Sequence, residues 1–267
     1  MTAPVLSVVV LNWNTCDSLR DCLRSLTPFP PAWELVVVDN ASTDNSVAMV
    51  QAEFPYARLI INTENRGFTG GNNQGIAAST GRHVLLLNSD TIVEPASLTV
   101  LVYFMDTHSE AGAVSPRLLR SDGSPQPYAF GRDPTPLYLL RRGLNQLLLH
   151  RHLHNWATNQ TQNVDWVSGA CLLVRRAVIE QVGLLDENMF MYFEDNDWCL
   201  RIRKAGWKVY YNPRVEIVHL GGQSLKKNLS AQSAYYDSLA YFYAKHYGQL
   251  SQWLLRLMLP LYRWVNR

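Results

Sequence analysis

The sequence lacks a charge excess, a membrane-spanning segment and a paired cysteine motif. Its 267 residues carry 24 Lys and Arg against 22 Asp and Glu, and a net charge of +2 gives no general nucleic-acid-binding footprint. No apolar run reaches the roughly 20 residues that a transmembrane helix needs. The four cysteines, Cys16, Cys22, Cys171 and Cys199, form no Cys-x-x-Cys pair. We therefore favour buried, reduced thiols over a zinc site or disulfides.

Targeting and nucleotide-loop motifs are also missing. Residues 1–4 run directly into an apolar strand, without the charged lead-in and cleavage site of a signal peptide, so we expect a cytoplasmic protein. The glycine-rich residues 65–75 lack the Gly-Lys-Ser/Thr of a Walker loop. What remains is a chain with 47% hydrophobic and 17% charged residues, which is typical of a folded globular protein.

Apolar strands alternate with helical patterns in the first half of the chain. The strands are expected at residues 5–11, 35–38, 58–61 and 84–87. The intervening helices are expected at residues 16–26, 47–54 and 71–79. Continuous apolar strands separated by helices predict an α/β fold with a mainly parallel central sheet, flanked by helices on both faces.

The second half of the chain is less regular. A stretch rich in Pro and Gly, residues 116–136, interrupts the pattern. Helices are expected at residues 137–153, 176–182, 195–205, 230–247 and 251–265. Strands are expected at residues 164–174, 208–211 and 215–219. The last two helices form a C-terminal helical extension.

Polar residues gather where the predicted strands end. They include Asn12, Asn14, Asp39, Asn88, Ser89 and Asp90. Ligands bind past the carboxyl ends of parallel strands, where Asp39 could accept hydrogen bonds from a ribose or a base. Ser42 or Asp44 could instead cap the following helix. We expect both, with Asp39 as a ligand contact and Asp44 as a cap.

Four glycines fall within the stretch Asn65–Gly75, between two predicted strands. Glycine lets the backbone approach a ligand closely, and the helix N-terminus that follows favours an anion. Asn65, Gly67 and Asn72 are therefore candidates for contact with an anionic ligand.

Asp90 and His219 are the candidate metal ligands. Asp90 ends the motif Asn88-Ser-Asp after an apolar strand, and Mg²⁺ and Mn²⁺ are commonly shared between carboxylates and substrate phosphates. A strand-end turn, in which Asp90 caps toward Pro95, explains the motif equally well. His219 ends a later strand before two glycines and could bind a metal, although a lone histidine more often has a structural role.

Three carboxylates, Glu194, Asp195 and Asp197, fall within four residues at a predicted helix start. Acids stabilise a helix N-terminus, so capping is one interpretation. Three acids preceded by aromatic residues exceed what capping requires. Crowded carboxylates also raise one pKa among them, which suits a general base, and we therefore favour a catalytic role.

Together these motifs resemble those of the family-2 glycosyltransferases with a GT-A fold, and within that family the rhamnosyltransferase-like members of bacterial surface-polysaccharide pathways. The similarity covers about residues 6 to 224. The motifs that carry it are Ser7–Asn14, Val38–Asp44, Asn65–Phe68, Asn88–Asp90, Ser168–Ala170, Glu194 with Asp195, Asp197 and Arg201, and His219. The resemblance implies a catalytic domain at residues 1–224, with a nucleotide-binding half at about 1–115 and an acceptor half at 116–224. The helical extension, residues 225–267, follows it.

The resemblance also implies a role for each motif. The residues that would bind the nucleotide-diphospho-sugar are Asn12, Asn14, Asp39, Asn65, Gly67, Asn72, Asn88 and Ser89. Asp90 and His219 would hold a divalent metal, Mg²⁺ or Mn²⁺, on the diphosphate. The residues that would line the sugar and the acceptor are Trp166, Gly169, Ala170 and Arg201. Asp195, oriented by Glu194 and Asp197, would deprotonate a hydroxyl of a glycan or lipid-linked acceptor, and a single displacement would invert the anomeric carbon.

One departure from the family pattern concerns charge at the metal. The family motif is often Asp-x-Asp, whereas the first position here is Asn88, which leaves one fewer negative charge. Two other functions stay open. A sugar-nucleotide nucleotidyltransferase would need a glycine-rich basic loop where this chain has Asn12–Thr15, and a non-catalytic sugar-nucleotide-binding module would not need three carboxylates beside a metal motif.

Two basic, apolar segments suggest contact with a membrane surface. Residues 137–153 combine leucines with arginines and histidines. Residues 249–267 combine leucines and Trp253 with three arginines, and no acid follows Asp237. Basic amphipathic helices with Trp can lie on anionic bilayers, although packing on the domain or on a second copy explains the terminal helix equally well. We therefore expect the cytoplasmic protein to work near the inner face of the plasma membrane.

Overall fold

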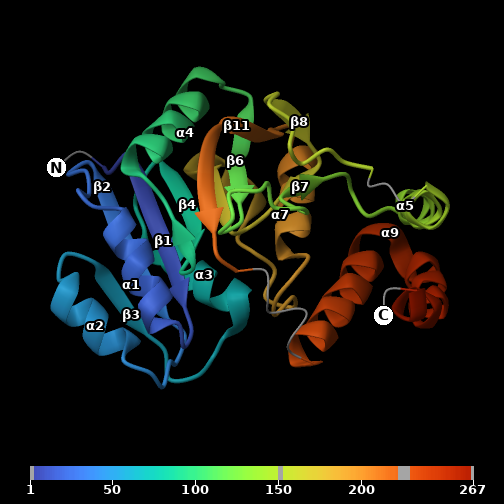
Figure 1. Cartoon of the computed structure of the whole chain (residues 1–267), viewed down its shortest axis with the longest axis horizontal. Coiled ribbons are helices and arrows are strands. Elements are labelled where there is room, and N and C mark those ends of the chain that lie inside the picture. Colours follow the sequence, from blue (N-terminus) through green and yellow to red (C-terminus); the bar gives the residue numbers. More distant parts are fainter. Residues whose placement is uncertain (1–2, 150–152, 222–228, 266–267) are drawn as a thin grey trace.

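The computed structural model describes residues 3–149, 153–221 and 229–265 (Figure 1). The strands are β1 (Leu6–Asn12), β2 (Trp33–Asp39), β3 (Arg58–Ile61), β4 (His83–Asn88), β5 (Thr91–Ile92), β6 (Ala111–Leu119), β7 (Phe130–Gly131), β8 (Gln162–Val164), β9 (Trp166–Val167), β10 (Cys171–Arg175) and β11 (Lys208–His219). The helices are α1 (Cys16–Ser25), α2 (Ser46–Glu53), α3 (Gly67–Ala78), α4 (Pro95–Thr107), α5 (Pro136–Leu149), α6 (Arg176–Val182), α7 (Glu194–Lys204) and α9 (Leu229–Val265).

One nine-stranded sheet forms the centre of the molecule, in the order β3-β2-β1-β4-β10-β6-β11-β5, with β8 paired to β11. β3, β2, β1 and β4 run parallel to one another, as their apolar runs predict. β10 is antiparallel to both β4 and β6, while β6 and β11 are parallel. The predicted α/β fold with a mainly parallel sheet is confirmed, and the antiparallel β10 joins its two halves.

The parallel half is stable because its strands bury both faces. Val8, Val9 and Val10 of β1 have no exposed surface, so helices must cover the sheet on each side. Four free cysteines lie among the described residues, as expected; three are buried, but Cys16 at the start of α1 is partly exposed.

Three sequence predictions in the second half were wrong. α4 and β6 were not expected, and β6 continues through Pro116 into the stretch that the prolines were expected to break. Residues 164–174 form parts of three short strands rather than one, because the chain turns at Asp165 and again at Ser168–Ala170. The two late strands are one strand, β11, with an irregular register between Asn212 and Glu216.

The C-terminal extension packs on the domain. α9 is interrupted at Gly248 (φ 81°, ψ 168°), close to the break expected between its two halves. Its first half joins a second apolar cluster, with Phe242 and Tyr243 fully buried against Met189 and Phe193 before and at the start of α7. In Figure 1, α5 and α9 lie together at the side of the molecule opposite β2 and β3. The expected boundary at residue 224 lies outside the described residues.

No helix in the described ranges is long and apolar enough to cross a bilayer.

Candidate active site

The carboxyl ends of β1, β2 and β4 are joined by side-chain hydrogen bonds. Asn12 Nδ2 donates to Asp39 Oδ1 at 3.0 Å, and Asn12 Oδ1 accepts a bond from Thr15 Oγ1 at 2.6 Å. Thr15 Oγ1 lies 2.9 Å from Ser89 Oγ. The structure therefore brings together three of the predicted donor-binding residues, Asn12, Asp39 and Ser89. Asn12 and Asp39 are almost fully buried, so they shape the floor of this edge.

A tight turn after β2 completes this edge. The Ser42 N–H donates to Asp39 Oδ2 at 2.9 Å, and the Asn14 N–H donates to Ser42 Oγ at 2.9 Å. Asn14 Oδ1 accepts the Thr43 N–H at 2.7 Å. Asn14 and Ala41 both have left-handed backbone angles, with φ of 54° and 63°. The side chain of Asn14 is thus used to hold two loops together, and its contact with a nucleoside stays a prediction.

Asp44 caps two helices at once. Its Oδ1 accepts the Ser46 N–H at 3.0 Å where α2 begins, and its Oδ2 accepts the Cys16 N–H at 3.0 Å where α1 begins. The predicted capping role of Asp44 is confirmed, and the cap positions both loops that follow β1 and β2.

The glycine-rich stretch is a buried helix rather than a loop. α3 begins at Gly67, four residues earlier than expected, and a Cβ on Gly71 or Gly75 would overlap the β1 side chains Leu11 and Val9. Gly67 has φ of 72° and lies against Phe190, which precedes α7. Close packing therefore explains Gly67, Gly71 and Gly75, and the expectation that these glycines let the backbone approach a ligand stays a prediction.

The two asparagines of this stretch are also used within the protein. Asn65 Oδ1 accepts bonds from Asn40 Nδ2 at 2.8 Å and from the Gly67 N–H at 2.9 Å. Asn72 Nδ2 donates to the Phe68 carbonyl at 2.9 Å inside α3. Ligand contacts by Asn65, Gly67 and Asn72 stay predictions.

Asp90, in the turn between β4 and β5, and His219, at the end of β11, face each other. Asp90 Oδ1 lies 3.2 Å from His219 Nε2, and the Leu220 N–H donates to the Asp90 carbonyl at 2.8 Å. The other ring nitrogen, Nδ1, lies 2.8 Å from Gln126 Oε1, which fixes the ring and favours a proton on Nδ1. Gly221 passes so close that a Cβ there would overlap Asp90. The sequence thus predicted two residues that the fold does bring together.

The pair fits a divalent cation. His219 Nε2 and the Asp90 carboxylate face each other, and both are groups that can bind a divalent cation. Two adjacent ligands of Mg²⁺ lie about 3 Å apart, close to the separation observed. The described residues contain no cluster of three or more His, Cys, Asp or Glu around a metal, so further ligands would come from phosphate and water.

Asn88 orients this pair. Its Nδ2 lies 3.3 Å from His219 Nε2, where it can donate to the ring. An aspartate at this position would instead oppose a lone pair with a second carboxylate. The departure from Asp-x-Asp therefore places an amide where an aspartate would add a charge, and a cation bound to His219 Nε2 would replace the Asn88 hydrogen bond.

The segment Ser168–Ala170 lies between Asn88, near Asp90 and His219, and Asp195 at the start of α7. The Gly169 N–H donates to Asp195 Oδ2 at 3.1 Å, and the Ala170 carbonyl accepts the Asn88 N–H at 3.0 Å. Two predicted residues, Gly169 and Ala170, thus place the start of α7 beside the end of β4.

Glu194 and Asp195 share an environment that raises both pKa values. Burial raises the pKa of Asp195 to about 6, although the N–H groups of Gly169 and Asn196 donate to its carboxylate. Burial and the neighbouring Asp195 raise the pKa of Glu194 well above its usual range, and Glu194 Oε2 has no partner among the described groups. Both carboxyl groups therefore hold a proton to a higher pH than free carboxyl groups do, which suits a general base.

Asp197 has the opposite environment. Burial alone would raise its pKa, but hydrogen bonds and ion pairs from His246, Arg201 and Lys245 outweigh burial and lower the pKa to about 2. Arg201 Nε donates to Asp197 at 2.8 Å, and its other nitrogens donate to the Val182 and Leu184 carbonyls. The fully buried Asp197 and its partner Arg201 are thus bound within the protein, and the expected roles of Asp197 in orienting Asp195 and of Arg201 at the acceptor stay predictions.

Trp166 lies on the small β7–β9 ribbon. Its Nε1 donates to the Arg132 carbonyl at 2.9 Å, and its ring covers Gly131. The indole N–H is therefore occupied, which leaves the ring as the part of Trp166 that a sugar could contact.

Comparison with known proteins decides the family. The family model described as glycosyltransferase-like family 2 matches residues 3–237. The chain belongs to glycosyltransferase family 2. A relative from Mycobacterium tuberculosis is N-acetylglucosaminyl-diphospho-decaprenol L-rhamnosyltransferase, which is 31% identical to this chain. The alignment covers 96% of this chain and 91% of the relative. A low-salt glycan biosynthesis hexosyltransferase from Haloferax volcanii is 28% identical over 80% of this chain and 66% of its own.

The fold of this family-2 glycosyltransferase also matches solved structures. A mannosyltransferase from Pyrobaculum calidifontis, in complex with GDP-Man and Mn²⁺, superposes with a TM-score of 0.58 at 17% identity. The match covers 98% of this chain and 81% of that protein. At this identity the likeness supports the GT-A fold alone.

Sequence reasoning missed several residues that shape the transferase site. Gln126 lies in the Pro- and Gly-rich stretch, where no local pattern indicates contact with His219 at 93 residues' distance. Lys245 and His246 reach Asp197 from α9, and single-sequence reasoning has no signal for that contact. The pairing of Asp197 with Arg201 had one, because acid and arginine at i and i+4 face each other on a helix.

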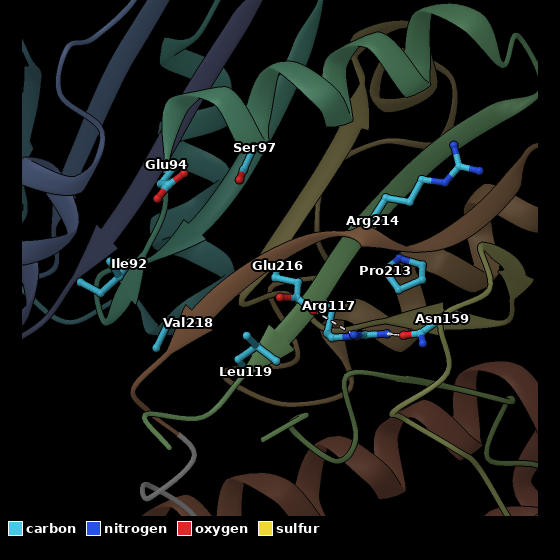
Figure 2. A pocket seen from close by; sticks show the side chains of 10 residues that line it. All are labelled: Ile92, Glu94, Ser97, Arg117, Leu119, Asn159, Pro213, Arg214, Glu216 and Val218. Carbon is cyan, nitrogen blue, oxygen red and sulfur yellow. Dashed lines mark hydrogen bonds and ion pairs between the residues drawn. The ribbon is translucent and has the colours of Figure 1, made fainter. Parts of the chain in front are cut away.

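A separate hollow lies on the transferase between β5, α4, β6 and β11 (Figure 2). Its volume is about 640 Å³, and its lining holds none of the predicted site residues. Figure 2 shows Arg117 pointing toward Glu216 and Asn159, and its nitrogens lie 2.8 and 2.6 Å from their oxygens. Arg117 is thus already paired within the protein, whereas Arg214, which also lines the hollow, is exposed.

Proposed function

We propose that this transferase moves a sugar, with rhamnose as the first candidate, from a nucleotide-diphospho-sugar to a glycan or lipid-linked acceptor in surface-polysaccharide synthesis. The observation that carries the proposal is Asp195, a carboxylate with its pKa raised to about 6 at the start of α7. It is linked through Gly169 and Ala170 to the strand end that leads to Asp90. A base and a diphosphate site on one edge are what direct displacement at an anomeric carbon requires.

Asp195 acts as the general base in this proposal. One carboxylate oxygen takes the proton of the acceptor hydroxyl while the acceptor oxygen forms its bond to the anomeric carbon. The bond from that carbon to the diphosphate breaks, and the nucleoside diphosphate leaves. Attack opposite the leaving group inverts the anomeric carbon. The pKa of Glu194 is raised, because burial and the neighbouring Asp195 disfavour a second negative charge at this place.

Asp90 and His219 would hold a divalent cation, Mg²⁺ or Mn²⁺, with the donor diphosphate. When bound, such a cation neutralises charge on the departing diphosphate. Gln126 would keep the His219 ring in place for this task through its contact with Nδ1. Asn12, Asp39 and Ser89 form the adjoining edge on which the nucleoside would lie.

Two basic segments of the chain favour sugar transfer at a membrane surface. Residues 134–164 and 238–267 contain seven of the 24 Lys and Arg and none of the 22 acids, so the rest of the chain is net negative. Each segment also presents an exposed apolar stripe at helical spacing. The stripes are Leu137, Leu140, Leu144 and Leu148 of α5, and Leu250, Trp253, Leu254 and Leu257 of α9. Such basic, amphipathic helices suit peripheral binding to the anionic inner face of the plasma membrane, where a lipid-linked acceptor is available.

The donor is tested by thermal shift. The protein is screened with UDP-, GDP- and dTDP-sugars, each with and without Mn²⁺, because a bound donor stabilises by mass action. We expect a shift that needs Mn²⁺, followed by sugar transfer to a lipid-diphosphate acceptor. Asp195→Asn should keep the shift and lose about 10³-fold in turnover. Wild-type turnover in that variant would reject Asp195 as the base.

Membrane contact is tested separately by co-sedimentation with vesicles. The full chain, a truncation before Gln249 and Trp253→Ser are compared on anionic and on zwitterionic vesicles. We expect the full chain to bind anionic vesicles and both variants to bind less. Equal binding by all three would remove the α9 stripe from the proposal, and a change from dimer to monomer on truncation would assign the stripe to self-association.

A further inference from the structure

The first half of α9 binds both ends of the loop that leads into α7. Lys245 Nζ lies 2.7 Å from Asp186 Oδ2 and 2.7 Å from Asp197 Oδ1, so one ammonium joins the beginning of the loop to the helix that follows it. His246 Nε2 lies 2.7 Å from Asp197 Oδ1, and Tyr241 Oη donates to Asp186 Oδ2 at 3.1 Å. We call Tyr241, Lys245 and His246 the α9 clamp.

The backbone inside the clamped loop is strained. Tyr192 and Phe193 both have left-handed angles, with φ of 71° and 64°, directly before Glu194 and Asp195. Bulky residues rarely adopt this conformation, which costs of order 1–3 kcal/mol each unless the surroundings impose it. Aromatic packing from α9 supplies such surroundings. The Phe193 ring lies 5.1 Å from the Tyr235 ring and 5.8 Å from the Phe242 ring, measured between centroids.

The opposite side of the same loop is held by α3. The Phe68 N–H donates to the Phe190 carbonyl at 2.8 Å, and Thr69 Oγ1 donates to the Met189 carbonyl at 2.8 Å. The loop therefore lies between α3 of the catalytic domain and α9 of the C-terminal extension. With α9 removed, the α3 contacts alone would have to maintain the two left-handed residues.

Helical geometry carries this restraint to Asp195. Residues two apart on an α-helix point about 200° apart, at 3.6 residues per turn. Asp197 accordingly faces the α9 clamp, while Asp195 faces the Gly169 N–H. Anchors on opposite sides of one turn fix the rotation of α7 about its axis, and hence the direction of the Asp195 carboxylate.

We propose that the α9 clamp positions the catalytic base, with Lys245 and His246 as positioning residues that act through Asp197; this inference rests on the proposed glycosyl transfer. The C-terminal extension is then a working part of the acceptor half as well as a candidate membrane contact. A misplacement of a reacting group by about 1 Å can cost on the order of 10²-fold in rate, so a few contacts of this kind are sufficient to matter.

The test uses the full chain with Lys245→Met, His246→Leu and His246→Gln, and Lys208→Met as the matched control. Lys208 lies on β11, half-exposed, 4.0 Å from Glu110. Kinetics are measured with dTDP-rhamnose, or with the nucleotide sugar that gives the largest thermal shift. We expect Lys245→Met and His246→Leu to lower kcat about 10-fold or more while the donor KM and the donor-induced thermal shift stay within twofold. His246→Gln, which keeps an N–H donor, should recover most of the kcat, and Lys208→Met should match wild type.

Two results would overturn the inference. One is kcat within twofold of wild type in both Lys245→Met and His246→Leu. The other is a parallel loss of kcat and donor binding in both variants, which would indicate a general stabilising role instead. A wild-type protein that binds donor but transfers no sugar to any acceptor would reject the proposed function itself, whereas active wild type with unaffected variants rejects only the clamp.

Discussion

The edge of β1, β2 and β4 and the start of α7 are built in different ways. The strand edge is held by side-chain hydrogen bonds between residues that the parallel topology already brings together, such as Asn12 and Asp39. The start of α7 depends on buried charges, strained backbone and a helix that begins more than 30 residues later. The sheet topology thus determines the positions of the residues at the strand ends. The position of Asp195, the proposed base, depends instead on contacts made by the C-terminal extension.

The largest effect is expected where the strand edge meets the donor. Asp90→Ala should remove the carboxylate proposed to hold the cation and lower kcat/KM by on the order of 10³-fold. The Mn²⁺-dependent part of the donor thermal shift should disappear as well. Asp106→Ala, at the other end of the domain beside His83, is the matched control and should leave both readouts unchanged. An Mn²⁺-dependent shift that survives in Asp90→Ala would contradict the assignment of Asp90.

Asp197→Asn and Asp195→Asn should change stability in opposite directions. Asp197 has its pKa lowered to about 2, so its charge stabilises the fold above pH 4, and that stability is lost as the pH falls through about 2. Asp197→Asn leaves Lys245 and Arg201 without a charged partner and should lower the free energy of unfolding by about 3 kcal/mol.

The pKa of Asp195 is raised to about 6, so its negative charge destabilises the fold at neutral pH. The lost free energy of unfolding is regained as the pH falls below 6 toward 4. Asp195→Asn should therefore stabilise by about 2 kcal/mol, or roughly 4–8 °C in Tm. Denaturant unfolding of both variants at pH 7.5 measures whether each substitution raises or lowers the free energy of unfolding. A destabilised Asp195→Asn would show that the buried carboxylate is better satisfied than its contacts suggest.

A smaller effect should follow from Gly71→Ala, which tests the packing of α3 on β1. The new methyl group would overlap Leu11, and overpacking should cost about 1–3 kcal/mol. Gly143→Ala, in α5 with open space around it, is the control and should be neutral or slightly stabilising. If Gly71→Ala left stability unchanged but raised the donor KM, the glycine would serve the ligand rather than the core.

The smallest expected effect is on pH dependence. A base with a pKa of about 6 must lose its proton to act, so kcat should fall about tenfold between pH 7 and pH 5. Stopped assays with saturating donor and acceptor over this range measure the midpoint. A midpoint near 4 would mean that Asp195 is more hydrated during turnover than in the structure.

The comparison also explains what the sequence could predict. β1 to β4 were placed to within about two residues because each is an apolar run that must be buried on both faces. Asp90 and His219 were named as candidates because one follows a predicted strand and the other ends one, and the structure places their side chains 3.2 Å apart. Polar residues at strand ends are visible in a single sequence, since the topology alone determines where they meet.

The helix side escaped prediction for physical reasons. The loop before α7 has no periodicity, and its left-handed residues, Tyr192 and Phe193, are of types that give no turn signal. The contact between Asp197 and His246 spans 49 residues and depends on how α9 docks. α4 is different, because Leu98, Leu101, Val102 and Met105 have helical spacing and follow a proline, so a signal was present and was overlooked.

The separation of charge between the two basic segments and the rest of the chain gives the molecule a permanent electric dipole. The field of a negatively charged surface would exert a torque on this dipole. The torque would turn α5 and the end of α9 toward the surface before contact is made. The torque acts over about 10 Å at 0.1 M salt and over longer distances at lower salt, because mobile ions screen it. The rate of productive encounters should therefore respond to ionic strength even if the bound state does not.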